Sequence, residues 1–417
     1  MPQITDGCAS KNAVTRDSDL TYCKKMRSRR KIYLDYQAST PLDPAVLREM
    51  LPFLTESFAN PHSADHAAGW EAARAVEESA NKLSTMIGCD PDEIIFTSGA
   101  TEANNLAIIG LRKVLKSKKR KKIITSRIEH KSILSACRAL AEEFDAEILY
   151  CDVRVDGCID LGHLQELLSD QVLLVTFGGV NSEIGSIQSV PEIYKLADRH
   201  GVLVHVDGAQ MPAAVSLDAV SHTVAMMSLS SHKMYGPKGI GCLYVERSLQ
   251  RDLAPIVFGG GQQNGLRSGT LPVPLCVGMG SAAQLSRKPE ERHSLRNKSR
   301  KLWDALRAID DRLVLNGPAG SDRHPGNLNI RFPGILAEDL LASLQPTLAA
   351  SIGSACTSGI PEPSHVLRGI GLTEDEARSS IRFSVGRFTT ESEIEEAAEL
   401  VASAFSQLDR LGMREAL

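Results

Sequence analysis

The sequence lacks any long apolar run. Its longest runs, such as Val202–Val206, fall far short of the roughly 20 residues that a membrane-spanning helix needs. The net charge is only -4 and the pI about 6.3, so no global field favours binding to nucleic acid. A hydrophobic content of 42% and a charged content of 24% are typical of a soluble globular protein. Because 417 residues exceed one ordinary hydrophobic core, we expect two domains.

The sequence also lacks a paired-cysteine pattern. Its nine cysteines contain no CxxC pair and are odd in number: Cys8, Cys23, Cys89, Cys137, Cys151, Cys158, Cys242, Cys276 and Cys356. This argues against a disulfide framework or a metal site and favours a reducing compartment. We therefore expect a cytoplasmic protein with no bound metal.

Residues 1–30 lack apolar periodicity and lead into a basic run at 24–31. No apolar segment of a secretory signal is present. We expect a flexible, solvated arm. A contact arm for nucleic acid or for a partner is the alternative.

From there on, short β-branched runs alternate with helical stretches. Strands are predicted at 93–96, 122–125, 172–176, 202–206, 224–229 and 239–245. Continuous apolar strands separated by helices indicate a mostly parallel α/β sheet with both faces covered. A polar helical stretch at 288–307 breaks this rhythm, and beyond it strands at 328–332 and 380–384 and helices at 336–344 and 391–411 indicate a smaller α+β domain. We place the domain boundaries at 31–48 (a segment packing with the small domain), 49–285 (the large domain) and 286–417 (the small domain).

A lysine directly follows one of the apolar strands, in the segment SSHKMYGPKG of residues 230–239. A desolvated lysine has a lowered pKa and can form a Schiff base with an aldehyde cofactor. The preceding hydroxyls, including that of Ser230, and His232 are candidates for holding a phosphate. For this segment alone, a structural turn is the alternative to a site around Lys233.

Another apolar strand ends with a carboxylate, Asp207 of HVDGAQ. An acid at the carboxyl end of a strand belongs to the ligand-binding edge of an open α/β sheet. Pyridoxal 5'-phosphate (PLP) needs an anion beside its pyridinium nitrogen, and Asp207 with Lys233 fits that need. Alone, Asp207 fits a helix cap equally well.

Two further strand ends carry weaker signals. The segment TSGATE at 97–102 joins a strand to a helix, and a helix N-terminus attracts anions, although the segment also suffices as a helix cap. His130 of EHKS follows the strand at 122–125. It could cover a cofactor ring and move protons, or be a structural histidine.

Together these segments carry a resemblance. The chain resembles the cysteine desulfurases of the NifS/IscS type, class V aminotransferase-like enzymes of PLP fold type I, from about Ile32 to about Leu411. The motifs occur in the order of that family: IYLDYQASTPLDP, TSGATEANNLAI, EHKSIL, VNSEIG, HVDGAQ, SSHKMYGPKGIG, GGGQQNGLRSGTLPV, GSACTSG and SSIRFSVGRFT. The resemblance implies a large domain with a mostly parallel seven-stranded sheet plus a smaller α+β domain.

The resemblance also implies roles for residues. Lys233 binds PLP as a Schiff base, His130 stacks on its ring as an acid–base group, Asp207 pairs with the pyridinium nitrogen, and Gln210 reaches the phenolic oxygen. The implied phosphate ligands are Ala100, Thr101, Ser230, His232 and, from the second subunit of a homodimer, Thr270. Asn181 and Arg382 orient the substrate L-cysteine, Arg382 through a bidentate grip on its carboxylate. An arginine between Ile381 and Phe383 of an apolar strand is otherwise a costly choice.

Cys356 matches the persulfide-forming cysteine of that family. It lies in GSACTSG, a stretch of small residues bounded by glycines, a composition that suits an exposed loop better than a core. The implied reaction converts L-cysteine to L-alanine and leaves the sulfur on Cys356, from which a sulfur-acceptor protein receives it.

The sequence departs from the family pattern in three places. Ser182 replaces a second Asn, Gln263 and Asn264 replace an acid and an arginine, which could alter the dimer edge, and the chain ends at Leu417 without the longer tail that docks an iron–sulfur scaffold. Iron–sulfur assembly, DNA phosphorothioate modification and tRNA thiolation stay open as pathways. Rival functions are a selenocysteine lyase, another class V aminotransferase, and an inactive adaptor paralogue. The adaptor is disfavoured by the presence of the site residues Lys233, His130, Asp207 and Arg382.

Overall fold

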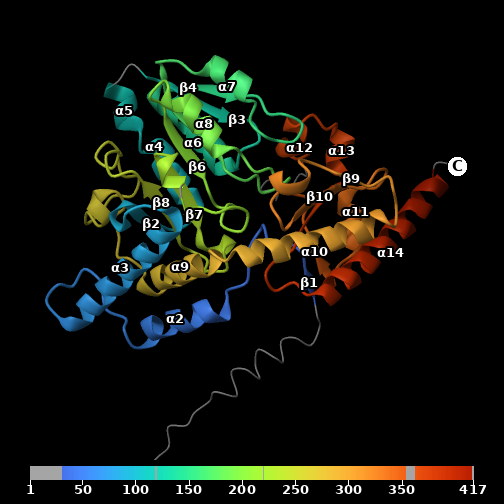
Figure 1. The fold of residues 1–417 in the computed structure, drawn as a ribbon, viewed down its shortest axis with the longest axis horizontal. Coiled ribbons are helices and arrows are strands. Elements are labelled where there is room, and N and C mark those ends of the chain that lie inside the picture. The colour runs from blue at the N-terminus through green and yellow to red at the C-terminus, as the bar shows by residue number, and fades with distance from the viewer. Residues whose placement is uncertain (1–30, 118–119, 219, 354–361, 416–417) are drawn as a thin grey trace, which may run out of the picture.

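The computed structural model describes residues 31–117, 120–218, 220–353 and 362–415. Its centre is a seven-stranded sheet in the order β2-β8-β7-β6-β5-β3-β4 (Figure 1). The strands are β2 (Ile94–Thr97), β3 (Lys122–Ser126), β4 (Glu147–Cys151), β5 (Val172–Gly178), β6 (Leu203–Asp207), β7 (Met226–Ser230) and β8 (Gly241–Val245). Only β8 runs antiparallel to its neighbours in this sheet. The prediction of a mostly parallel sheet is confirmed.

Helices cover both faces of this sheet because successive apolar side chains of a strand point to opposite sides. On β2, Ile94 and Phe96 join one core, and Ile95 joins the other. The core of Ile95 is closed by α4 (Ala100–Ile109), α5 (Arg112–Ser117) and α6 (Lys131–Phe144). The opposite core is closed by α2 (Pro44–Thr55), α3 (Ala67–Ile87), α7 (Leu161–Leu167), α8 (Val190–Asp198) and α9 (Val273–Ser286).

A separate core lies in the C-terminal part of the chain. Its helices are α10 (Pro289–Arg307), α11 (Ala337–Ser343) and α14 (Glu391–Glu415), and its antiparallel sheet contains β9 (Val314–Leu315), β10 (Asn327–Arg331) and β12 (Ser380–Ser384). The long helix α10 crosses from the region below the large sheet to this part, where it lies along α14 (Figure 1). Near the chain start, β1 (Ile32–Tyr33) pairs with β11 (Leu348–Ala349), and Ile32 and Leu34 are buried in this C-terminal core. This separate core supports the predicted division into two domains. The exact boundaries stay predictions.

Two short helices lie between the cores. Both α12 (His365–Gly369) and α13 (Glu374–Arg378) contribute to a small cluster with Ile128 and Ile184 of the large part. In the described ranges no helix is long and apolar enough to cross a membrane. The expected arm at 1–30 lies outside the described residues.

Candidate active site

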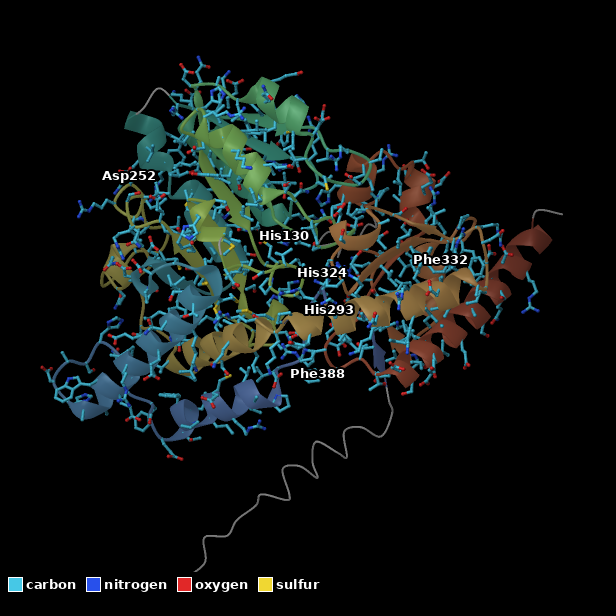
Figure 2. All side chains as sticks on the ribbon, viewed as in Figure 1. His130, Asp252, His293, His324, Phe332 and Phe388 are labelled. Atoms are coloured by element: carbon cyan, nitrogen blue, oxygen red, sulfur yellow. The ribbon has the colours of Figure 1, made fainter. Side chains whose placement is uncertain are left out.

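One edge of the large sheet gathers the predicted residues. His130 follows β3, Asn181 follows β5, and Asp207 ends β6, while the short helix η3 (Ser231–Lys233) follows β7. The antiparallel β8 makes β2 parallel to β7, so Thr97 and the start of α4 reach the same edge. Figure 2 shows His130 between the large sheet and the C-terminal part. Residues from five strand ends therefore converge here, as the open α/β architecture dictates.

The amine of Lys233 is held by backbone carbonyls. Its Nζ donates to the oxygen of Gln37 at 2.5 Å and to that of Ala38 at 2.9 Å. Burial, reinforced by Arg382, lowers the pKa of Lys233 to about 8, although Asp207 and Asp35 oppose the shift. More of this amine is unprotonated at neutral pH than in an ordinary lysine, as attack on an aldehyde requires.

Asp207 lies in a fixed orientation beside the lysine. It is 8% exposed and accepts hydrogen bonds from Asn104 Nδ2 at 2.7 Å and from the backbone N–H of Ala209 at 3.0 Å. The sequence did not predict Asn104 as a partner of Asp207. The sequence offered no distinct signal for it, because α4 also contains the polar residues Thr101, Glu102 and Asn105.

His130 is the N-cap of α6. Its Nδ1 accepts from the backbone N–H of Ser132 at 3.2 Å and lies 2.7 Å from the Ser132 hydroxyl. Partial desolvation lowers the pKa of His130, with Lys233 and His365 adding to the effect and Asp207 opposing it. The side chain is exposed, so a neutral imidazole is available to a ligand.

The predicted phosphate side is built from the start of α4 and from η3. Ala100 and Thr101 form the first turn of α4, and Thr101 is exposed. A Cβ added to Gly241 would lie 2.6 Å from the backbone of Gly99, so glycine there allows β8 to approach this helix start. Backbone N–H groups of such a first turn attract an anion.

On the other strand end, Ser230 is 5% exposed, and His232 Nδ1 lies 3.2 Å from Ser39 Oγ. Burial, with Lys233 and Lys238 nearby, lowers the pKa of His232 to about 4. His232 is therefore neutral and can act on a phosphate as a hydrogen-bond donor.

Gln210 and Lys233 share a partner that the sequence reasoning did not assign. Gln210 Nε2 donates to the backbone oxygen of Gln37 at 2.9 Å, the oxygen that also holds the lysine amine. The Gln37 side chain is 3% exposed, and its Oε1 accepts from Asn327 Nδ2 at 2.6 Å. Its Nε2 is a buried donor without a partner among the described residues. Gln37 thus connects both cofactor candidates to β10 of the C-terminal part.

Arg382 reaches the site from β12. It is 4% exposed, and its Nη1 donates to the Ser182 carbonyl at 2.8 Å while its Nη2 contacts Asp35 Oδ1 at 2.7 Å. Because Ser182 contributes a backbone oxygen, the replacement of asparagine at this position leaves the contact intact. Two of the guanidinium nitrogens are thus engaged, Nη1 by the Ser182 carbonyl and Nη2 by Asp35, while Nε has no partner among the described residues.

Asn181 holds the loop after β5 rather than contacting Arg382. Its Oδ1 accepts from the backbone N–H groups of Glu183 and Ile184 at 2.9 and 3.0 Å, and its Nδ2 donates to the Ile128 carbonyl at 3.2 Å. Asn181 therefore joins the strand ends of β5 and β3.

Two buried carboxyls border the site and were not predicted. Glu129 accepts from Ser126 and from the Gly178 N–H, each at 2.6 Å, and burial raises the pKa of Glu129 to about 7. Burial also raises the pKa of Glu183 to about 7, against the effect of a hydrogen bond from Ser364 and the charge of Arg382. The available signal was an acid a few residues after an apolar strand, at the edge of the sheet where the other site residues were predicted.

The loop that carries Thr270 is tied to the start of α4. Arg267 Nε donates to Glu102 Oε1 at 2.8 Å. The Gln263 side chain accepts from Phe96 N at 2.7 Å and donates to Phe96 O at 2.9 Å. A carboxylate at position 263 could not make the second bond, so this departure changes how the loop is attached to β2. Thr270 itself is exposed.

Cys356 lies outside the described residues. Six other cysteines are described: Cys89, Cys137, Cys151, Cys158, Cys242 and Cys276. Burial raises the thiol pKa of each of them, so they are weak nucleophiles at neutral pH. Within the described ranges no group of three or more His, Cys, Asp or Glu side chains could hold a metal ion.

Comparisons with known proteins place this site in context. The pattern of the family described as "Aminotransferase class-V" matches residues 32–396. A protein of Rickettsia bellii (strain OSU 85-389) named "Cysteine desulfurase IscS" is 46% identical over 379 residues, which are 90% of this chain and 92% of the relative.

Two solved structures share the fold. A "NIFS-LIKE PROTEIN" superposes with a TM-score of 0.83 at 30% identity, covering 90% of this chain and 99% of its own. "SspA in complex with cysteine" superposes with a TM-score of 0.75 at 36% identity, covering 86% of this chain and 99% of its own. The fold expected from the resemblance is confirmed.

Proposed function

The chain belongs to the aminotransferase class-V family, and from that premise we propose that it is a PLP-dependent cysteine desulfurase that converts L-cysteine to L-alanine. One observation carries the proposal. Lys233 lies at the carboxyl edge of the sheet, and burial lowers its pKa to about 8. The charges of Asp207 and Arg382 both act on its amine. A reactive amine, a fixed anion and a carboxylate-binding cation are the groups that PLP and an amino acid require.

The residues present fit PLP. Asp207 offers an acceptor held by two donors, the start of α4 offers backbone N–H groups, and Lys233 offers a partly unprotonated amine. When bound, PLP withdraws electrons from the substrate Cα. Asp207 would lie at the pyridinium nitrogen, Gln210 at the phenolic oxygen and His130 on the ring, while Ala100, Thr101, Ser230, His232 and the partner subunit's Thr270 would hold the phosphate.

The substrate is oriented by the C-terminal part. Arg382 is buried, and its planar guanidinium can bind the carboxylate of cysteine. Asn181 fixes the loop whose Ser182 carbonyl holds the guanidinium. Lys233 then accepts the proton from Cα, a transfer that its lowered pKa favours.

The sulfur step is assigned to Cys356. A bond forms between the Cys356 thiolate and the substrate sulfur while the bond between that sulfur and Cβ breaks. Protonation of the remaining carbon fragment yields alanine, and the sulfur stays on the enzyme as a persulfide. A sulfur-acceptor protein of the same compartment, which we place in the cytoplasm, would take it up by thiol exchange.

A homodimer would complete the site. Apolar side chains are exposed on α2 (Leu47, Leu51 and Leu54), in the segment after it (Phe58) and on α3 (Trp70). Exposed large apolar side chains on successive elements favour an interface with a second subunit. The exposed Thr270 could then reach the phosphate of the partner's site.

The test is sulfide release from L-cysteine with a reducing thiol. Cys356→Ser should retain the yellow bound cofactor and lose sulfide release, and mass mapping of the wild-type protein should find the persulfide on the peptide that contains Cys356. Undiminished sulfide from the variant would disprove the role of Cys356. Alanine formation from selenocysteine alone would instead favour a selenocysteine lyase, and a colourless protein would favour an adaptor.

A further inference from the structure

Asn104 is a polar residue on the buried face of α4. It is 0% exposed and lies among Ala103, Leu106 and Ala107 of α4. Its Oδ1 has no hydrogen-bond partner among the described residues. An unpaired buried amide oxygen opposes folding, so the stability of α4 does not account for asparagine at this position.

The amide orientation of Asn104 follows from its neighbours. One side-chain atom contacts both Asp207 Oδ2, at 2.7 Å, and Ser132 Oγ, at 2.8 Å. A carboxylate oxygen only accepts hydrogen bonds, so the contacting atom is the nitrogen, and both of its protons are used. The unpaired oxygen is the consequence of aiming both N–H groups at these two partners.

The next link determines the protonation of His130. Its Nδ1 receives the backbone N–H of Ser132 at 3.2 Å, and a backbone N–H can only donate. The Ser132 hydroxyl accepts from Asn104 and has one proton left, which it can donate to the same Nδ1 at 2.7 Å. Because Nδ1 is an acceptor, it carries no proton, and the neutral ring carries its proton on Nε2.

We propose that Asn104 is a positioning residue that, through Ser132, holds His130 as the neutral Nε2–H tautomer and ties its ring to the Asp207 carboxylate. The inference rests on the proposed function for its catalytic meaning. His130 then offers a hydrogen-bond donor at Nε2, and a second proton on the ring would require the cap at Nδ1 to break. The proton removed from the substrate goes to Lys233 instead.

The charges around His130 agree with this arrangement. Lys233, Lys131 and His365 disfavour the imidazolium, while Asp207 favours it. Asp207 is itself engaged by Asn104 and by the Ala209 N–H. His365 Nε2 contacts the Glu129 carbonyl at 3.0 Å, beside the start of α6.

The tautomer can be measured directly. In PLP-loaded protein labelled with 15N-histidine, the signals that disappear in His130→Gln should show a protonated Nε2 and an unprotonated Nδ1. Ser132→Ala and Asn104→Ala keep the backbone N–H of Ser132 at Nδ1 but lose or release the hydroxyl proton that reinforces it, so the Nδ1 signal should broaden through exchange between the two tautomers. In both variants kcat should fall about tenfold, the loss expected when one hydrogen bond is removed, while KM stays nearly constant.

The same helix offers a matched control. Asn105 Nδ2 donates to the Thr101 carbonyl at 2.8 Å within α4, so Asn105→Ala should leave both the histidine signals and kcat unchanged. Ser132→Thr keeps the hydroxyl and should restore the wild-type tautomer.

A protonated Nδ1 in the wild type would overturn the proposal, as would histidine signals in Ser132→Ala and Asn104→Ala that are identical to those of the wild type. If Asn104→Ala does not fold, Ser132→Ala decides. The tautomer is recorded without turnover, so a wild-type protein that binds PLP but releases no sulfide would defeat the proposed function and leave this inference standing.

Discussion

Two cations face the site from opposite parts of the molecule. Lys233, after β7, donates to the carbonyls of Gln37 and Ala38, and its pKa is lowered to about 8. Arg382, on β12, is paired with the Asp35 carboxylate. Carbonyl oxygens accept hydrogen bonds without neutralising the charge, whereas a carboxylate does both. Lys233, which must give up a proton, thus has no direct carboxylate partner. Arg382, which must keep its charge, has one.

Removing the lysine should have the largest effect. In Lys233→Ala both the covalent attachment of PLP and the base are lost, so sulfide release should fall by roughly 10³-fold or more. Borohydride treatment followed by mass spectrometry should find PLP attached in the wild type and absent from the variant. Lys238→Ala removes an exposed lysine of the same segment and should keep both properties; retained attachment in Lys233→Ala would refute the assignment.

Removing the arginine should weaken substrate binding. Arg382→Leu leaves the substrate carboxylate and Asp35 without their cation, so KM for cysteine should rise about 10²-fold, or ~2.7 kcal/mol. Arg382→Lys keeps the charge but loses the planar fork, so its effect should be intermediate.

The control for this pair is Arg378→Leu. Arg378 forms an i,i+4 pair with Glu374 just before β12, and its loss should leave KM unchanged. A KM for Arg382→Leu within about twofold of the wild type would show that the carboxylate binds elsewhere.

The smallest effect should be a shift in pH dependence. Because the pKa of Lys233 is lowered to about 8, capture of PLP by the apo-protein should accelerate up to about pH 8 and then level off. The charged amine is the form that burial penalises, so apo-protein stability should rise between pH 8 and the usual lysine pKa of 10.5. Asp35 raises the pKa of Lys233, so Asp35→Asn should move the kinetic midpoint to lower pH. Stopped-flow absorbance measures this midpoint, and an upward shift would contradict the electrostatic account.

The sequence predicted the sheet and the strand ends well because both depend on local pattern. Asp207 and Lys233 follow apolar runs directly, and parallel strands bring their carboxyl ends to one edge. Strand β4 was not predicted: three of its five residues are half-buried at the sheet edge, where the apolar pattern is weak.

The contacts that tune the site could not be predicted in the same way. Gln37 contacts Lys233, which lies 196 positions away in the sequence, and Asn104 contacts Asp207, which lies 103 positions away. Such pairings arise from packing rather than from local propensity. The roles of the site residues, Cys356 included, stay predictions for the experiments above.

The Gln263 side chain protects the protein against aggregation in a crowded solution. Strand β2 is a terminal strand of the large sheet, and the N–H and C=O of its Phe96 are both occupied by the Gln263 amide. A bare edge would offer these groups to a strand of another molecule and invite aggregation. The Gln263 side chain therefore takes the place of a pairing strand at Phe96 and prevents this edge of the sheet from pairing with a strand of another molecule.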